Sequence, residues 1–185
     1  IIFEDCDSDI GKANGGNGKS LVMRSVEHFG KKLSFQDGQI FQGRGTGGSR
    51  FQFSNVTLDT KIIWIDDLHE KFDLKSIYSM LTDDLTVEGK GVNKFIIPRA
   101  RKPKFGMTSN YVVQATDTST IRRIHTVEFG NFWSRCVREG ETPVDYLGKN
   151  LFTDFDETDW NDFFLWGFEC VKQYLRDGLY QVKID

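Results

Sequence analysis

A glycine-rich segment that ends in lysine and serine constrains this chain more than any other feature of its sequence. Residues 13–20 read Ala-Asn-Gly-Gly-Asn-Gly-Lys-Ser, the phosphate-loop pattern G-x-x-x-x-G-K-[ST] with Ala13 in place of the first glycine. Glycines lack a Cβ, so consecutive backbone N–H groups can close around phosphate oxygens. Lys19 adds a positive charge for the β- and γ-phosphates, and the Ser20 hydroxyl can ligate Mg²⁺. The predicted nucleotide-binding residues are Asn14, Gly15, Gly16, Asn17, Gly18, Lys19 and Ser20.

The sequence on either side of this loop has the character that a phosphate loop requires. Ile1–Phe3 is apolar and predicts a strand, and the apolar spacing of Leu21, Val22, Val26 and Phe29 predicts a helix after the loop. The amino end of that helix would face the bound anion. The connection from strand to loop is longer than the minimal form and carries the acids Glu4, Asp5, Asp7 and Asp9.

Composition sets outer limits on the class of protein. A chain of 185 residues with 38% hydrophobic residues suits one packed domain with a small appendage. The formal net charge is −3, so any nucleic-acid-binding surface has to be local. Three widely spaced cysteines, Cys6, Cys136 and Cys170, fit a reduced cytoplasmic compartment better than a disulfide framework or a metal site. No apolar run approaches the ~20 residues that span a bilayer. Because the chain opens on a core strand without Met, we expect it to be a fragment of a longer protein.

A second motif begins at Thr60 and ends in two acids. Ile62–Ile65 is continuously apolar, which predicts a central parallel strand buried on both faces. Asp66 and Asp67 follow it, at the end of the strand where ligands of parallel sheets bind. Asp66 can hold Mg²⁺ through water, and Asp67 can orient the water that attacks a phosphate. Paired acids also commonly end a strand at solvent, so this interpretation depends on the phosphate loop upstream.

Two further polar groups fit the same chemistry. Lys104–Asn110 predicts a strand whose last residue, Asn110, could bind both the attacking water and the γ-phosphate, although such an Asn is often a turn residue. Arg122 and Arg123 precede another strand-like run at 124–129. Guanidinium groups of this kind can stabilise transition-state charge, often from a neighbouring subunit, although surface arginines usually serve solubility.

A basic segment lies between these motifs. Asp73–Leu81 predicts a helix with Asp73 as its N-cap, and the runs 85–88 and 94–97 predict a hairpin. From the tip of this hairpin onward the basic residues have no acid among them, which favours a nucleic-acid-binding surface. A solvated charged loop is the alternative interpretation. The candidate DNA-binding residues are Lys90, Lys94, Arg99 and Arg101. The glycine-rich stretch 38–48 predicts a mobile surface loop rather than a second phosphate loop, because no Lys-Ser/Thr pair and helix follow it.

Residues 1–130 together resemble the ATPase core of superfamily 3 helicases, and in particular the poxvirus-type and phage-type primase–helicases. The resemblance rests on Asn17-Gly18-Lys19-Ser20, the strand ending in Asp66-Asp67, the basic arm leading to Thr108-Ser109-Asn110, and Arg122-Arg123. It implies an α/β P-loop NTPase fold of modified AAA+ type that uses ATP and Mg²⁺. It also implies a ring, usually a hexamer, around single-stranded DNA, with a fused or partner primase domain in a phage or mobile element.

The resemblance also implies a role for each matching residue. Lys19 and Ser20 would bind phosphate and Mg²⁺, Asp66 the metal, and Asp67 the water. Asn110 would sense the γ-phosphate, and Arg122 or Arg123 would act across the subunit interface. A hairpin in the pore would place Lys90 and Lys94 on the DNA.

The remaining residues, 131–185, predict a C-terminal extension. We expect 130–157 to be irregular, followed by one amphipathic helix with Trp160, Phe164, Phe168, Val171 and Leu175 on one face and a stop at Gly178. This face predicts packing on the ATPase core, with a partner surface as the alternative.

Three functions of different classes remain open from the sequence. The first is a DNA-stimulated ATPase motor, and the second is an ATP-driven assembly switch or loader that binds nucleic acid without unwinding it. The third, a small-molecule P-loop kinase, has no use for a sensor at Asn110.

Overall fold

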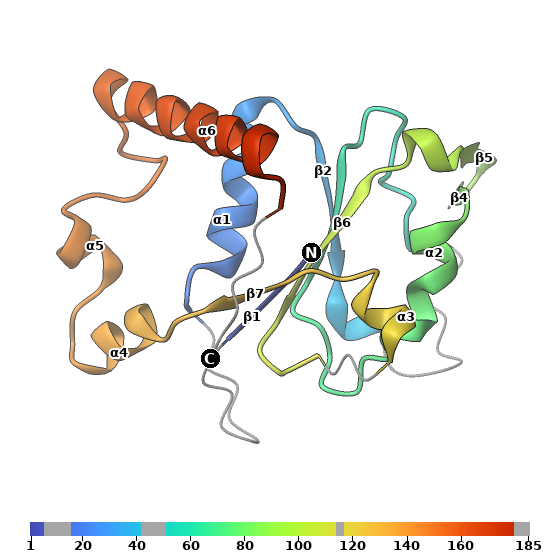
Figure 1. Cartoon of the computed structure of the whole chain (residues 1–185), viewed down its shortest axis with the longest axis horizontal. Helices are drawn as coiled ribbons and strands as arrows, with labels where there is room; N and C mark the ends of the chain where they lie inside the picture. The colour runs from blue at the N-terminus through green and yellow to red at the C-terminus, as the bar shows by residue number, and fades with distance from the viewer. Residues whose placement is uncertain (6–15, 42–50, 114–116, 180–185) are drawn as a thin grey trace. The chain divides into compact units, whose positions relative to one another are not determined.

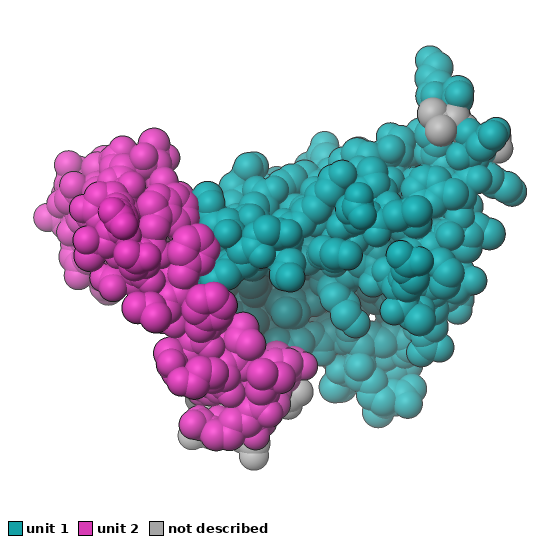
Figure 2. Space-filling view, turned by 90° about the horizontal axis from the view of Figure 1, so that it is seen from above, with its two compact units in different colours: residues 1–131 teal, residues 132–185 magenta. Residues whose placement is uncertain are grey.

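The computed structural model describes residues 1–5, 16–41, 51–113 and 117–179. It divides the chain into two compact units, Ile1–Asn131 and Phe132–Asp185 (Figure 2). This division falls beside the boundary predicted between residues 130 and 131. Each unit is described by itself.

A parallel sheet organises the first unit. Within the described residues its five strands are β1 (Ile2–Asp5), β2 (Leu33–Asp37), β3 (Ile62–Asp66), β6 (Lys104–Ser109) and β7 (Thr126–Phe129). Their order across the sheet is β2-β3-β6-β1-β7, and every neighbouring pair is parallel (Figure 1). Strand β6 therefore separates β1, which precedes the phosphate loop, from β3, which ends in the paired acids. The carboxyl ends of all three meet at one edge.

Helices cover both faces of this sheet, as predicted for an α/β fold. Figure 1 shows α1 (Lys19–Ser25) on one side and α2 (Tyr78–Thr82) and α3 (Thr118–Ile121) on the other. Successive side chains of β3 point to opposite faces of the sheet. Trp64 packs with Phe3, Met23 and Leu33 on the α1 side, whereas Ile63 and Ile65 belong to the larger cluster on the other side. Strand β3 is thus buried on both faces, as its apolar run predicts.

Short 3₁₀ helices join these elements, and they alter two of the predicted helices. Helix α1 ends at Ser25 and continues as η1 (Val26–Phe29), and its buried residues are Lys19 and Met23, four apart. Leu21 and Val22, which belong to the apolar spacing that predicts this helix, are exposed, whereas Lys19 and Met23 form its buried face. The helix predicted at 73–81 begins as η3 (Leu74–Ile77), and Asp73 caps it by accepting a hydrogen bond from the Lys75 N–H.

The predicted hairpin is present as two antiparallel strands, β4 (Leu85–Gly89) and β5 (Val92–Ile97). Both strands are longer than predicted, so the turn is only Lys90-Gly91, and Gly91 takes the positive φ of 74° that this turn requires. Leu85, Val87 and Ile97 anchor the hairpin in the larger core cluster. Beyond β5 the chain forms η4 (Arg99–Arg101) before entering β6.

The second unit is more ordered than predicted. The stretch expected to be irregular contains α4 (Phe132–Arg138) and α5 (Pro143–Leu147). A capping box between Thr142 and Asp145, with Pro143 in the first turn, starts α5 and explains why so short a helix forms. The predicted long helix is α6 (Glu157–Asp177), and it ends at Gly178 as expected. Its first turns pack in an aromatic cluster within this unit: Phe152, Phe155, Trp160, Phe163 and Phe164. Packing of α6 on the first unit stays a prediction.

In the described parts of the chain, no helix combines the length and apolar character needed to cross a membrane.

Candidate nucleotide site at the carboxyl edge of the sheet

Lys19 lies at the centre of the site. It is the first residue of α1, and its side chain is buried rather than extended into solvent. Its Nζ donates to Asp5 Oδ2 at 2.6 Å and to Asn110 Oδ1 at 3.0 Å. The ammonium group therefore bridges the ends of β1 and β6. Gly18, directly before it, has a φ of 88°, a conformation that a residue with a side chain rarely adopts.

Ser20 and Asp66 form a second contact, between α1 and β3. The Ser20 hydroxyl donates to Asp66 Oδ1 at 2.9 Å, and Thr108 donates to the same oxygen at 2.6 Å. The second Asp66 oxygen, Oδ2, takes part in neither bond. Strand order explains this meeting, because Thr108 lies in β6, directly beside β3.

Asp67 has an unusual backbone and is held at several points. Its φ of 56° lies in the left-handed region, which Asp tolerates better than most residues. Its N–H donates to Thr108 Oγ1 at 2.7 Å, and its Oδ1 accepts from Asn110 Nδ2 at 2.9 Å. Gln39 Nε2 donates to both Asp67 O at 2.8 Å and Asp67 Oδ2 at 2.9 Å. Strained residues held this firmly are concentrated at functional sites.

Asn110 connects the two halves of the site. Its amide oxygen faces Lys19, which can only donate, and its amide nitrogen faces the Asp67 carboxylate, which accepts. These partners fix the orientation of the amide. A continuous series therefore runs from Asp5 through Lys19 and Asn110 to Asp67, between three strand ends that are distant in the sequence.

The structure thus brings together Lys19, Ser20, Asp66, Asp67 and Asn110 among the predicted site residues. Gly16, Asn17 and Gly18 lie beside them at the start of α1. Asn14 and Gly15 lie outside the described residues.

The two predicted arginines do not join this cluster within the chain. Arg122 and Arg123 precede β7, so they lie at the amino end of that strand, whereas the cluster occupies the carboxyl ends of the parallel strands. Arg123 lies over the Tyr78 ring, 4.9 Å from its centroid, and donates to the Ser119 carbonyl. Arg122 is exposed. An arginine acting in trans remains a prediction.

The predicted DNA-binding residues are all solvent-exposed: Lys90, Lys94, Arg99 and Arg101. Lys102, in the same basic stretch, turns inward instead and donates to the carbonyls of Met80 and Asp83. Burial lowers the pKa of the Lys102 amine, although the nearby Asp83 opposes this effect. Lys102 therefore serves to attach the arm to α2.

Sequence reasoning missed three residues of the site. Asp5 is 3% exposed and uses both oxygens, one toward Lys19 and the other toward Asn17 Nδ2 at 2.9 Å. Thr108 holds both acids through one hydroxyl. Gln39 belongs to the stretch predicted to be a mobile loop, but η2 (Gly38–Ile40) is a structured turn with Gly38 buried. The signal available for Asp5 was its position between the first strand and the phosphate loop.

The acid beside Asp5 serves a different purpose. Glu4 accepts a hydrogen bond from the Val113 N–H, and burial raises the pKa of its carboxyl group, with the charge of Glu128 adding to the effect. Glu4 and Asp5 are consecutive in β1 and so point to opposite faces of the sheet.

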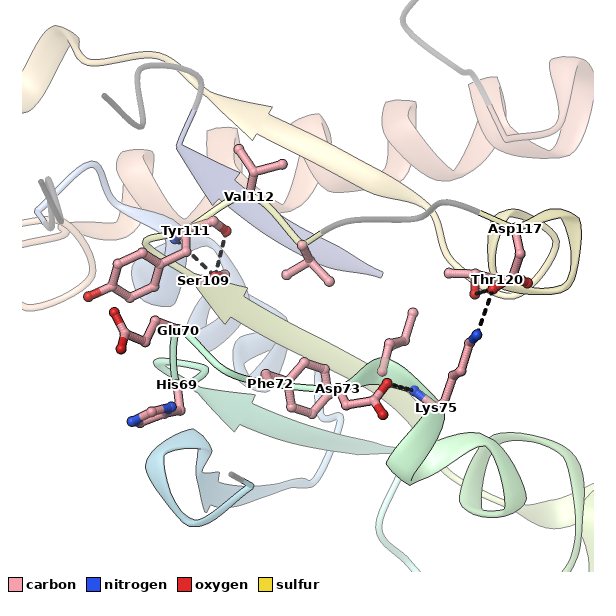
Figure 3. Close-up of a pocket in the computed structure, with 12 residues that line it drawn as sticks. His69, Glu70, Phe72, Asp73, Lys75, Ser109, Tyr111, Val112, Asp117 and Thr120 are labelled. Atoms are coloured by element: carbon pink, nitrogen blue, oxygen red, sulfur yellow. Dashed lines mark hydrogen bonds and ion pairs between the residues drawn. The ribbon is translucent and has the colours of Figure 1, made fainter. Parts of the chain in front are cut away.

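A separate cavity of about 370 Å³ lies within the first unit (Figure 3). Its wall comes from the segments after β3 and β6 and from α3, including His69, Glu70, Tyr111 and Asp117. Asp117 pairs with Lys75 at 3.3 Å, and hydrogen bonds from Ser119 and from the Thr120 N–H hold the pKa of Asp117 well below its usual range. None of the predicted catalytic residues lines this cavity.

Comparisons with known proteins add a distant structural likeness. No family model matches the sequence, and no curated protein matches it. Among solved structures, a crystal structure of JCV helicase bound to a small acetamide compound is similar, with a TM-score of 0.44 and 12% sequence identity. The match covers 93% of this chain and 51% of the helicase chain, so the chain spans about half the length of that protein. A likeness at this distance carries no argument about activity, so function has to be inferred from the side-chain contacts.

Proposed function

We propose that this chain is the motor domain of an ATP-dependent DNA helicase or translocase. It would be a P-loop ATPase of modified AAA+ type that hydrolyses ATP to move on single-stranded DNA during replication of a phage or mobile element. The observation that carries the proposal is the hydrogen-bonded series from Lys19 through Asn110 to Asp67, with Ser20 bonded to Asp66 beside it.

This series has the parts that phosphoryl transfer to water needs. Lys19 would contact the β- and γ-phosphates, and Asp67 would orient the attacking water. Asn110 lies between them, so one amide can contact the γ-phosphate on one side and the residue that positions water on the other. Asn110 would then respond to cleavage of the γ-phosphate, and β6 would transmit the resulting structural change.

The residues present also fit a magnesium ion. Ser20 and Asp66 offer hydroxyl and carboxylate oxygens at one point, the donors that Mg²⁺ prefers, and Asp66 Oδ2 is not used in the bonds to Ser20 and Thr108. Among the described residues no group of three or more His, Cys, Asp or Glu side chains could hold a metal by itself. This agrees with an ion held jointly by one or two protein oxygens and the substrate phosphates. When bound, Mg²⁺ would neutralise charge that develops on the phosphates.

The DNA would contact the hairpin and the arm that follows it. Lys90 lies at the turn and Lys94 on the exposed face of β5, while Arg99 and Arg101 lie in the following turn. In a homo-oligomeric ring, usually a hexamer, these residues would line a central channel. Arg122 or Arg123 would reach the nucleotide of the neighbouring subunit.

The test is ATP turnover with and without single-stranded DNA at low salt. We expect DNA to stimulate hydrolysis and both Lys19→Ala and Asp67→Asn to reduce turnover at least about 10²-fold, as losses of positioned charged groups do. Lys31→Ala, which removes an exposed lysine before β2, is the matched control and should leave turnover unchanged. Hydrolysis that is indifferent to DNA would count heavily against a motor.

The hairpin has its own test. Lys90→Ala and Lys94→Ala should abolish most of the stimulation by DNA while leaving basal hydrolysis intact, because neither lysine lies at the nucleotide. The same assay with Lys31→Ala controls for the loss of one positive charge. Equal stimulation in all three variants would place the DNA elsewhere.

A nucleotide-driven assembly switch or loader is the second candidate, because the same site would serve it. Strand-separation assays on the full-length protein distinguish the two. A motor separates strands in an ATP-dependent manner, whereas a loader binds the same DNA and leaves the duplex intact.

A further inference from the structure

Asp5 places a negative charge inside a site that is proposed to bind a negatively charged ligand. The residue is 3% exposed, and its carboxylate pairs with the ammonium group of Lys19, 2.6 Å away. The Asp5 and Lys19 side chains retain only 2% and 7% of their accessible surface. A carboxylate buried to this extent requires a paired charge or hydrogen-bond donors to offset its lost hydration.

The phosphate-loop lysine therefore already has an anionic partner within the chain. Lys19 has three donors, and Asp5 and Asn110 take two of them. A terminal phosphate of ATP would compete with Asp5 for the same positive charge and would be repelled by the carboxylate. Asn17, which belongs to the phosphate loop, is bonded to the other Asp5 oxygen, so the carboxylate holds the loop as well as the lysine.

We propose that Asp5 is an internal competitor of the nucleotide phosphates, which binds Lys19 in their place and weakens nucleotide binding so that product can leave. This inference rests on the proposed nucleotide site and assigns to it a positioning residue outside the phosphate-loop motif. This role of Asp5 explains why the Lys19 side chain points toward the end of β1, where the Asp5 carboxylate lies.

The test is the affinity of the full chain for nucleotides with and without the charge of Asp5. Asp5→Asn keeps the shape and an oxygen that can accept from Asn17, removes the negative charge, and turns the oxygen that faces Lys19 into an amide donor. We expect it to bind ADP and ATP about tenfold more tightly or better, because one repulsive charge near the phosphates is removed. AMP, which lacks the phosphates that Lys19 contacts, should bind wild type and variant equally. This dependence on phosphate number is a readout that a purely structural role of Asp5 would not produce.

Two further variants keep the test decisive. Asp59→Asn makes the same substitution at an exposed position before β3 and should leave all three affinities unchanged, because solvent and salt screen that charge. Asp5→Ser also removes the charge, keeps a hydroxyl acceptor for Asn17, and replaces Asp5→Asn if that variant does not fold.

Each outcome separates the inference from the function on which it rests. Wild type that binds ADP, together with a folded Asp5 variant that binds it equally or more weakly, overturns the inference alone. If neither wild type nor either Asp5 variant binds nucleotide, the proposed function is overturned and the inference with it. Binding only after Asp5 is neutralised supports both.

Discussion

At the scale of single residues, Asn110 is the side chain on which the proposed mechanism depends most. Its neutral amide offers an acceptor to Lys19 and a donor to Asp67 at the same time. Both partners are charged, which makes these hydrogen bonds stronger than neutral ones.

Replacing Asn110 with Asp should therefore inactivate the site. The carboxylate keeps the shape but loses the donor and places a second negative charge beside Asp67. We expect the kcat for ATP to fall by about 10²-fold, comparable to the loss of other positioned donors. Asn161→Asp, the same chemical change at an exposed position in α6, should leave basal ATP turnover at the wild-type rate.

Gln39 should act through Asp67 rather than through the nucleotide. Gln39→Ala removes two hydrogen bonds to Asp67, so we expect kcat to fall about tenfold while the KM for ATP changes little. Gln39→Glu should cost more, because a second carboxylate would face Asp67 Oδ2. A rise in KM without a change in kcat would show that Gln39 contributes to binding instead of positioning.

Several of these residues could be predicted from the sequence and others could not. Lys19, Ser20, Asp66, Asp67 and Asn110 lie in short local patterns, and parallel strands bring their ends to one edge. Asp5 and Gln39 carry no such pattern, and Thr108 lies in one that assigned it no role. Their roles depend on which strands are neighbours and on how closely η2 approaches the end of β3, and both follow from tertiary packing.

At the scale of elements, the approach of η2 to β3 depends on a glycine. A Cβ added at Gly38 would lie 2.5 Å from the carbonyl oxygen of Asp66 and 2.7 Å from the backbone of Asp67. No side-chain movement can make room for a Cβ this close to backbone atoms, so the turn or the end of β3 has to shift.

Gly38→Ala should consequently displace the acids and damage activity as well as stability. We expect a loss of about 1–3 kcal/mol in the free energy of unfolding, typical of overpacking, and a fall in ATP turnover larger than Gln39→Ala produces. Gly130→Ala is the matched control, because a Cβ there meets nothing within 4 Å. Denaturant titration and steady-state kinetics measure the two effects. A Gly38→Ala protein with wild-type turnover would mean that the position of Asp66 and Asp67 is not critical.

The elements themselves were predicted with uneven success, for physical reasons. Strand β3 has a continuous apolar run and the long helix α6 has a strong helical periodicity, both with clear ends, and both are present. Helix α1 was predicted from apolar spacing, but its buried face includes Lys19, which pairs with Asp5 and Asn110, and hydrophobic periodicity does not register a buried charge. Helices α4 and α5 were missed because each spans only one or two turns.

At the scale of the whole molecule, charge is distributed unevenly. The net charge of −3 coexists with exposed basic residues on the hairpin and its arm. Binding of DNA through such a local surface releases counterions, so the affinity should fall steeply as salt rises. Fluorescence anisotropy with a labelled single-stranded oligonucleotide at several salt concentrations measures this slope. Lys90→Ala should flatten it by roughly one unit, the value for one lost phosphate contact. An unchanged slope would remove the hairpin from the DNA surface.

The central claim is that nucleotide held at the Lys19 cluster and single-stranded DNA are bound by one assembly of this chain. Native mass spectrometry of the Asp67→Asn variant with Mg²⁺, ATP and an oligonucleotide tests it directly, because this variant should bind ATP without turning it over. The account predicts a ring, usually six copies of the 21.3-kDa chain, that carries both ATP and the oligonucleotide. A monomer that carries neither ligand at concentrations where wild type is folded would contradict it.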